Sequence, residues 1–107
     1  MKKENEVITL QGEEIIEVLS EIEYILISLR DIANYYYAHP ELSPTRETDI
    51  LYALETTRFI DKNRVNDRLN KMRNILSAPF NSAVDENDMD DIERALAKLR
   101  YWEKPGD

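Results

Sequence analysis

The sequence predicts an all-α fold, a compact bundle of about four amphipathic helices with a long first helix. Apolar residues recur at steps of three and four along most of the chain, which is the helical period. Gly occurs only 2 times and Pro only 4 times in 107 residues, which disfavours an all-β protein rich in tight turns. A chain of this length is expected to form a single helical domain, 1–107, with residues 1–11 as a flexible or short extended arm.

The first and longest helical pattern covers residues 13–38. Its main apolar stripe steps by four and three residues alternately, and a second stripe runs beside it. The main stripe is Ile15, Leu19, Ile22, Leu26, Leu29, Ala33 and Tyr36, and the second is Val18, Ile25 and Ile32. Together the stripes predict an apolar face wide enough to touch more than one neighbour. Pro40 disfavours helical geometry at His39, so this helix is expected to end at Ala38.

Two further helices are expected at residues 44–60 and 63–78. Ser43 is a preferred cap, Pro44 suits the first helical position, and Pro79 ends the later helix. The side chains expected to face inward are Ile50, Leu51, Leu54 and Ile60, followed by Val65, Leu69, Met72 and Leu76. No Pro or Gly lies between residues 45 and 78, so one kinked helix also fits the pattern. The polar stretch after Ile60 favours a break near residues 61–63.

The last helix is expected at residues 88–102, after a loop over residues 79–87. Met89, Ile92, Leu96 and Leu99 form its inward face. Acidic residues open this segment and basic residues follow in its second half, and both placements suit the helix dipole.

The net charge is −8, from 22 acidic and 14 basic residues. An acidic chain repels polyanions at long range, so direct nucleic-acid binding is not expected. Arg64, Arg68 and Lys71 share one helical face, which we interpret as a solvated face that offsets the acidic helices around it. Apolar runs are far shorter than the roughly 20 residues of a membrane span, so we expect a soluble, cytoplasmic protein.

Composition also limits the chemistry. Without cysteine, and with His39 as the single histidine, the chain has no disulfide, no thiolate zinc site and no site built on two histidines. Residues 85–90 superficially suggest a calcium loop, but Met89 and Asp90 stand where an oxygen ligand and Gly are required. We therefore expect no catalytic residues, no metal, no cofactor and no enzymatic activity.

The candidate partner-binding residues are acidic clusters and adjacent tyrosines. Three consecutive tyrosines point in directions about 100° apart on a helix, so they cannot all be buried. Tyr36 continues the main stripe, which leaves its two neighbours for the surface, where tyrosines are frequent binding anchors. The candidates are Glu13, Glu17, Glu21, Tyr35, Tyr37, Asp85, Glu86, Asp88, Asp90 and Asp91.

These features favour a small acidic, non-catalytic binding protein with a basic protein as its partner. The leading expectation is an immunity protein or antitoxin that neutralises a basic bacterial toxin, of nuclease type, by direct binding. Two alternatives stay open. One is a phage-encoded inhibitor of a nucleic-acid-binding defence complex, and the other is a helical adaptor or regulatory protein that acts as a homodimer.

Overall fold

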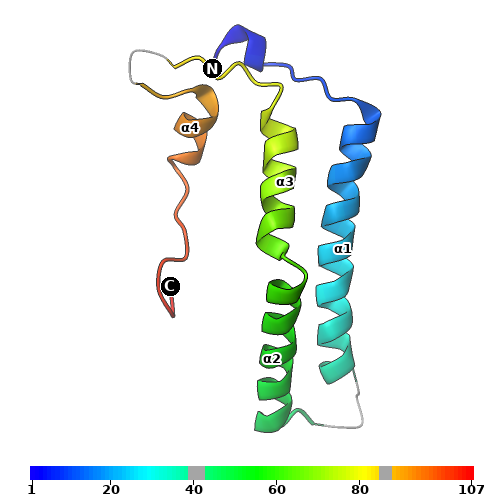
Figure 1. The fold of residues 1–107 in the computed structure, drawn as a ribbon. Coiled ribbons are helices and arrows are strands. Elements are labelled where there is room, and N and C mark those ends of the chain that lie inside the picture. Colours follow the sequence, from blue (N-terminus) through cyan, green and yellow to red (C-terminus); the bar gives the residue numbers. More distant parts are fainter. Residues whose placement is uncertain (39–42, 85–87) are drawn as a thin grey trace. The chain divides into compact units, whose positions relative to one another are not determined.

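The computed structural model describes residues 1–38, 43–84 and 88–107, and it confirms the all-α fold with a long first helix (Figure 1). The helices are η1, a 3-10 helix at Lys3–Asn5, and the α-helices α1 (Gly12–Tyr37), α2 (Arg46–Lys62), α3 (Val65–Ser77) and α4 (Asp91–Leu96). Within these ranges the chain contains no strand. It packs as two compact units: a hairpin unit, Gln11–Leu76, and a terminal unit, Met1–Leu10 with Ser77–Asp107. The expectation of a single domain, 1–107, stays a prediction.

Helix α1 begins and ends close to the predicted residues. At its start the Gln11 backbone N–H donates to the Glu14 carboxylate at 3.2 Å, as one half of a capping box. At its end the Ala38 N–H donates to the Asn34 carbonyl at 2.9 Å as the C-cap, and the helix ends at Tyr37. The end before Pro40 is therefore confirmed.

Helix α2 begins two residues later than predicted. Its cap is Thr45, whose hydroxyl accepts from the Thr48 N–H at 3.2 Å, while the Thr48 hydroxyl accepts from the Thr45 N–H at 3.3 Å. This reciprocal pair satisfies two backbone donors, which Ser43 with Pro44 behind it does not do.

Helices α2 and α3 are separate, and the break at Asn63 and Arg64 overlaps the predicted stretch 61–63, so the predicted break is confirmed. Arg64 has φ +52°, a left-handed conformation that interrupts the helical path. The Asn63 side chain donates to the Phe59 carbonyl at 3.3 Å, and the Arg68 guanidinium donates to the Asn63 carbonyl at 2.9 Å. Side chains thus satisfy carbonyls around the break.

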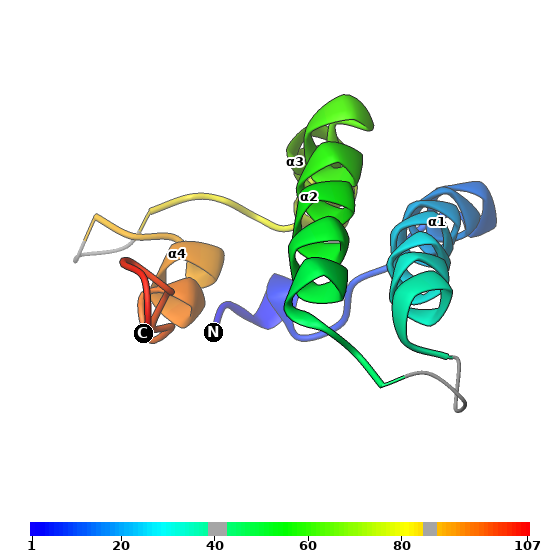
Figure 2. The ribbon, with the colours of Figure 1, turned by 90° about the horizontal axis from the view of Figure 1, so that it is seen from below.

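In the hairpin unit, α2 and α3 follow one another alongside α1 (Figures 1 and 2). The buried apolar side chains of the described chain all belong to this unit: Val18, Phe59, Val65 and Met72. The second stripe of α1, which includes Val18, faces α2 and α3, whereas Ile15, Leu19, Ile22 and Leu26 of the main stripe are 42–49% exposed. A helix with a single antiparallel layer beside it buries one stripe, so the first half of the main stripe lies outside the core of this unit.

The inward faces predicted for α2 and α3 are wrong in part. Val65 and Met72 are buried as predicted. The side chains that are exposed instead are Ile50, Leu51, Leu54, Ile60, Leu69 and Leu76. They lie off the line that faces α1, because within this unit α2 and α3 meet only the layer formed by α1.

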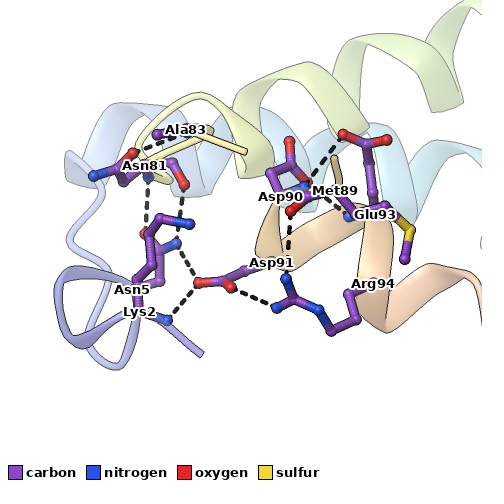
Figure 3. Close-up of polar contacts among 9 residues, drawn as sticks. All are labelled: Lys2, Asn5, Asn81, Ala83, Met89, Asp90, Asp91, Glu93 and Arg94. Carbon is purple, nitrogen blue, oxygen red and sulfur yellow. Dashed lines mark hydrogen bonds and ion pairs between the residues drawn. The ribbon is translucent and has the colours of Figure 1, made fainter. Parts of the chain in front are cut away.

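The terminal unit is held by polar contacts (Figure 3). Asn5 is buried, and its amide nitrogen donates to the Asn81 carbonyl at 3.0 Å and to the Asp91 carboxylate at 2.7 Å. The Asn81 N–H donates back to the Asn5 side-chain oxygen at 2.8 Å. The expected arm thus contains a short helix, η1, that anchors Asn5 between the segment after α3 and the start of α4.

Helix α4 is much shorter than the predicted 88–102. Asp90 caps it by accepting from the Glu93 N–H at 2.7 Å, and regular bonding ends at Leu96. Beyond it the amides of Lys98 and Leu99 donate only three residues back. Leu96 and Leu99, predicted to face inward, are exposed, so their burial does not stabilise a longer helix.

Candidate binding surface

The tyrosines cluster where the C-terminal end of α1 lies beside α2. The Tyr35 and Tyr36 rings meet edge to face at 5.0 Å, and Tyr36 meets Tyr52 of α2 at 6.4 Å. Tyr52 in turn meets Tyr37 at 5.2 Å. Tyr36 is half-buried, while Tyr35 is 73% and Tyr37 37% exposed, so the predicted division of the three consecutive tyrosines is confirmed. Such edge-to-face contacts hold aromatic rings in fixed directions.

The Tyr37 hydroxyl is tied to α2, because it donates a hydrogen bond to the Asp49 carboxylate. This bond and the negative charge of Asp49 raise the pKa of Tyr37 to about 12. Tyr35 presents the largest exposed ring of the cluster. Tyr37 therefore fixes the end of the hairpin, and Tyr35 is the ring best placed to meet a partner.

Beside the cluster, a groove runs between α1 and α2. It consists of two adjoining cavities of about 340 and 400 Å³, which share Asp31, Ile32 and Glu55. One cavity is further lined by Tyr24, Ser28, Arg58, Phe59, Lys62 and Asn63, and the other by Tyr35 and Tyr36. The groove therefore has carboxylates at its centre and aromatic rings toward both ends.

The cavity beside Tyr35 and Tyr36 suits a cation, because its charged lining residues are the acidic Asp31 and Glu55, whereas Arg58 and Lys62 also line the other cavity. Aromatic faces attract guanidinium and ammonium groups, and a carboxylate pairs with them through charge-assisted hydrogen bonds. One contact between a cation and an aromatic ring already exists within the chain, at the groove end that Tyr24 lines. The Arg68 guanidinium lies 4.3 Å from the centre of the Tyr24 ring. The Tyr24 hydroxyl donates to Asn63 at 2.9 Å, which fixes the ring. Glu55 pairs with Arg58 at 3.4 Å, an exposed contact that costs little to exchange.

Glu17 and Glu21 occupy the same charged side of the hairpin but are paired internally. Arg68 lies 3.0 Å from Glu21, and Lys71 lies 2.7 Å from Glu17. The hydrogen bond from Lys71 to Glu17, with the charge of that glutamate, raises the pKa of Lys71. Arg68 and Lys71 thus offset neighbouring acidic residues as predicted, while the acidic face of α1 is partly neutralised. Glu13 lies exposed one turn before Glu17.

The acidic residues that were predicted to form one cluster at 85–91 differ in their structural roles. Asp85 and Glu86 lie outside the described residues. Asp88 is exposed, with φ +56°, and Asp90 caps α4. Asp91 is only 5% exposed, so its position does not fit the surface role predicted for it.

Asp91 instead holds the terminal unit together (Figure 3). It accepts from the Asn5 side chain and from the Lys2 backbone N–H, each at 2.7 Å, and from Arg94 at 3.1 Å. The hydrogen bonds from Asn5 and Lys2 lower the pKa of this carboxyl below its ordinary value. A carboxylate held in this way is structural.

Sequence reasoning missed the acidic residues of the groove, Asp31 and Glu55. Asp31 lies four residues before Tyr35 on one face of α1, and Glu55 lies three residues after Tyr52 on α2. That helical spacing was the available signal. The pairing of the two helix faces is tertiary, and the sequence alone does not contain it.

Among the described ranges, no group of three or more His, Cys, Asp or Glu side chains is placed to hold a metal ion. The helices described there are also too short or too polar for any of them to cross a bilayer. Comparison of the chain with protein-family models found no match, and comparisons with curated proteins and with solved structures found none either.

Proposed function

We propose that this chain is a small acidic, non-catalytic binding protein that neutralises a basic protein by direct contact. The partner is a bacterial toxin of nuclease type, and the chain acts as its immunity protein or antitoxin in the cytoplasm. The observation that carries the proposal is the groove between α1 and α2, where Asp31 and Glu55 lie beside the exposed ring of Tyr35.

The mode of binding follows from the groove. A nuclease surface that attracts polyanions is rich in Arg and Lys. We expect one such side chain to stack on Tyr35 and to pair with Asp31 or Glu55. The chain's charge of −8 speeds the encounter, and the aromatic anchors slow dissociation. No chemical step by the chain is required.

Capture of partners from a lysate of the source cell tests the proposal. The natural chain and the pair Asp31→Asn with Glu55→Gln are immobilised at equal density. The matched control is Glu4→Gln with Glu6→Gln, which changes net charge equally but lies outside the hairpin unit. We expect the natural chain and the control to retain a basic protein that the groove variant loses.

The recovered protein is then assayed for nuclease activity while the natural chain is titrated in. Loss of activity at a stoichiometric ratio supports the proposal. Tyr35→Ala is expected to weaken this inhibition about thirtyfold, which is the loss of one binding anchor worth about 2 kcal/mol. Equal recovery by all three immobilised chains, or a retained partner that is acidic, contradicts the proposal.

A further inference from the structure

Within the hairpin unit, the side opposite the groove is apolar and uncovered. On α1 it carries the main stripe from Ile15 to Leu26, whose alternate steps of four and three residues are the a and d positions of a heptad repeat. Helices α2 and α3 pack against the neighbouring stripe instead. Ile15, Leu19, Ile22 and Leu26 consequently remain 42–49% exposed in a row along the helix.

Helix α3 extends this apolar side. Arg68 and Lys71 reach across to glutamates on the charged side of α1, which fixes the orientation of α3. At about 100° per residue, Leu69 and Leu76 then lie on the other side, level with the exposed stripe. Both are nearly half exposed. Six large aliphatic side chains from two neighbouring helices therefore form one surface, which we call the apolar side.

The area of the apolar side matches a dimer interface. A half-exposed Leu or Ile offers on the order of 50 Å² for burial, so six of them offer roughly 300 Å². A standard interface covers about 800 Å² on each partner, of which somewhat more than half is apolar. The six side chains supply most of that apolar share before their flanking residues are counted.

Charge at the edge of the stripe points to a second copy of the chain. Glu23 and Arg30 lie seven residues apart along one edge of the stripe, and both are exposed. When two copies of α1 pack antiparallel about a point near Leu26, Glu23 of each copy faces Arg30 of the other, as edge positions do in coiled coils. The stripe itself carries no charge, so it offers nothing specific to a basic partner.

We propose that the apolar side is a homodimer interface, in which two hairpins pack face to face around an antiparallel pair of α1 helices. Each hairpin supplies two helical layers, and the dimer becomes a four-helix arrangement with the stripe at its centre. The groove lies on the opposite side of the hairpin, so this proposal does not rest on the proposed function, and either can fail without the other.

Sedimentation equilibrium of the full chain tests the interface. We expect a species of twice the 12.6 kDa chain mass that dissociates on dilution. Glu23→Arg and Arg30→Glu each place like charges opposite one another twice per dimer, and each is expected to raise the dimer dissociation constant about tenfold. The double variant exchanges the two charges and is expected to restore the natural value.

Controls separate the interface from general charge effects and from folding. Glu6→Arg and Arg100→Glu make the same changes of net charge outside the hairpin unit and should leave dimerisation unchanged. Leu26→Ala should weaken the dimer at least tenfold while keeping the helical circular dichroism, because Ala is the best helix former. The proposal is overturned if the chain stays monomeric at all concentrations or associates only after a basic protein is added. It is also overturned if Glu23→Arg, Arg30→Glu and the double variant all dimerise equally.

Discussion

The hairpin unit and the terminal unit are stabilised by different physics. The hairpin unit buries Val18, Phe59, Val65 and Met72 between two helical layers and pairs its charges at the surface. The terminal unit has no buried apolar side chain among its described residues, and instead buries the polar pair Asn5 and Asp91. Apolar packing tolerates small changes of angle, whereas a buried polar pair is stable only when its hydrogen bonds are made.

This difference predicts which kind of substitution destabilises each unit. In the hairpin unit a loss of volume is the damaging change, and its cost grows with the size of the side chain removed. In the terminal unit the loss of one hydrogen-bonding atom leaves a partner buried and unpaired.

The largest effect is expected from Phe59→Ala. Phe59 is buried at the centre of the hairpin and meets the Tyr24 ring at 5.8 Å. Removing it leaves a cavity and should lower the free energy of unfolding by about 3 kcal/mol. Denaturant titration followed by circular dichroism measures the change. A loss below about 1 kcal/mol would show that the hairpin does not depend on this contact.

Asn5→Ala is expected to cost about 2 kcal/mol, confined to the terminal unit. The substitution removes three hydrogen bonds, to Asn81 and Asp91, and each of them lies inside that unit. Hydrogen-exchange mass spectrometry should show faster exchange at residues 88–96 with unchanged exchange at the centre of α1. Faster exchange along α1 to the same degree would show that the two units are not separately stabilised.

The two units should also respond to opposite ends of the pH scale. The pKa of Asp91 is lowered from 3.8, so its stabilising contribution is complete above that value and is lost as pH falls below it. The pKa of Tyr37 is raised from 10.0 to about 12, so its contribution is complete below pH 10 and is lost between pH 10 and 12. Acid should therefore loosen the terminal unit first, and alkali the tyrosine cluster first.

Exchange measured at both extremes, with Asp91→Asn and Tyr37→Phe as controls, tests this order. Each control removes one titrating group and should remove the corresponding pH response. A natural chain whose two units lose protection together at either extreme would contradict the assignment.

The smallest effect is expected from Thr56→Val, and it is stabilising. The Thr56 hydroxyl is buried and has no hydrogen-bond partner among the described residues. Val has the same shape without the unsatisfied oxygen, so the free energy of unfolding should rise by about 1 kcal/mol. Thr56→Ser, which keeps the hydroxyl and loses a methyl group, should move stability in the other direction.

The sequence predicted the hairpin unit well because its helices are periodic. Apolar spacing, the prolines and the polar residues between helices predicted three features of this unit. These are the bounds of α1, the break before Val65 and the burial of Met72. Spacing did not reveal which stripe of α1 is covered, since both stripes are apolar and the choice depends on where α2 packs. The exposed main stripe is therefore a finding of the structure.

The terminal unit could not be predicted in this way. Asn5 and Asp91 are 86 residues apart in the chain, and no periodicity links two isolated polar residues. Asp91 was therefore grouped with its acidic neighbours as a surface residue. The groove was missed for a similar reason, because Asp31 and Glu55 come together only when α1 and α2 pack.

The central claim is that the groove between α1 and α2 is the binding surface. Hydrogen exchange of the chain bound to its captured basic partner tests this claim most directly. The predicted result is slower exchange in the peptides that cover residues 24–36 and 52–62, with little change at residues 88–104. Slower exchange confined to residues 88–104, or to the apolar side around Leu19, would contradict the claim and move the binding surface elsewhere.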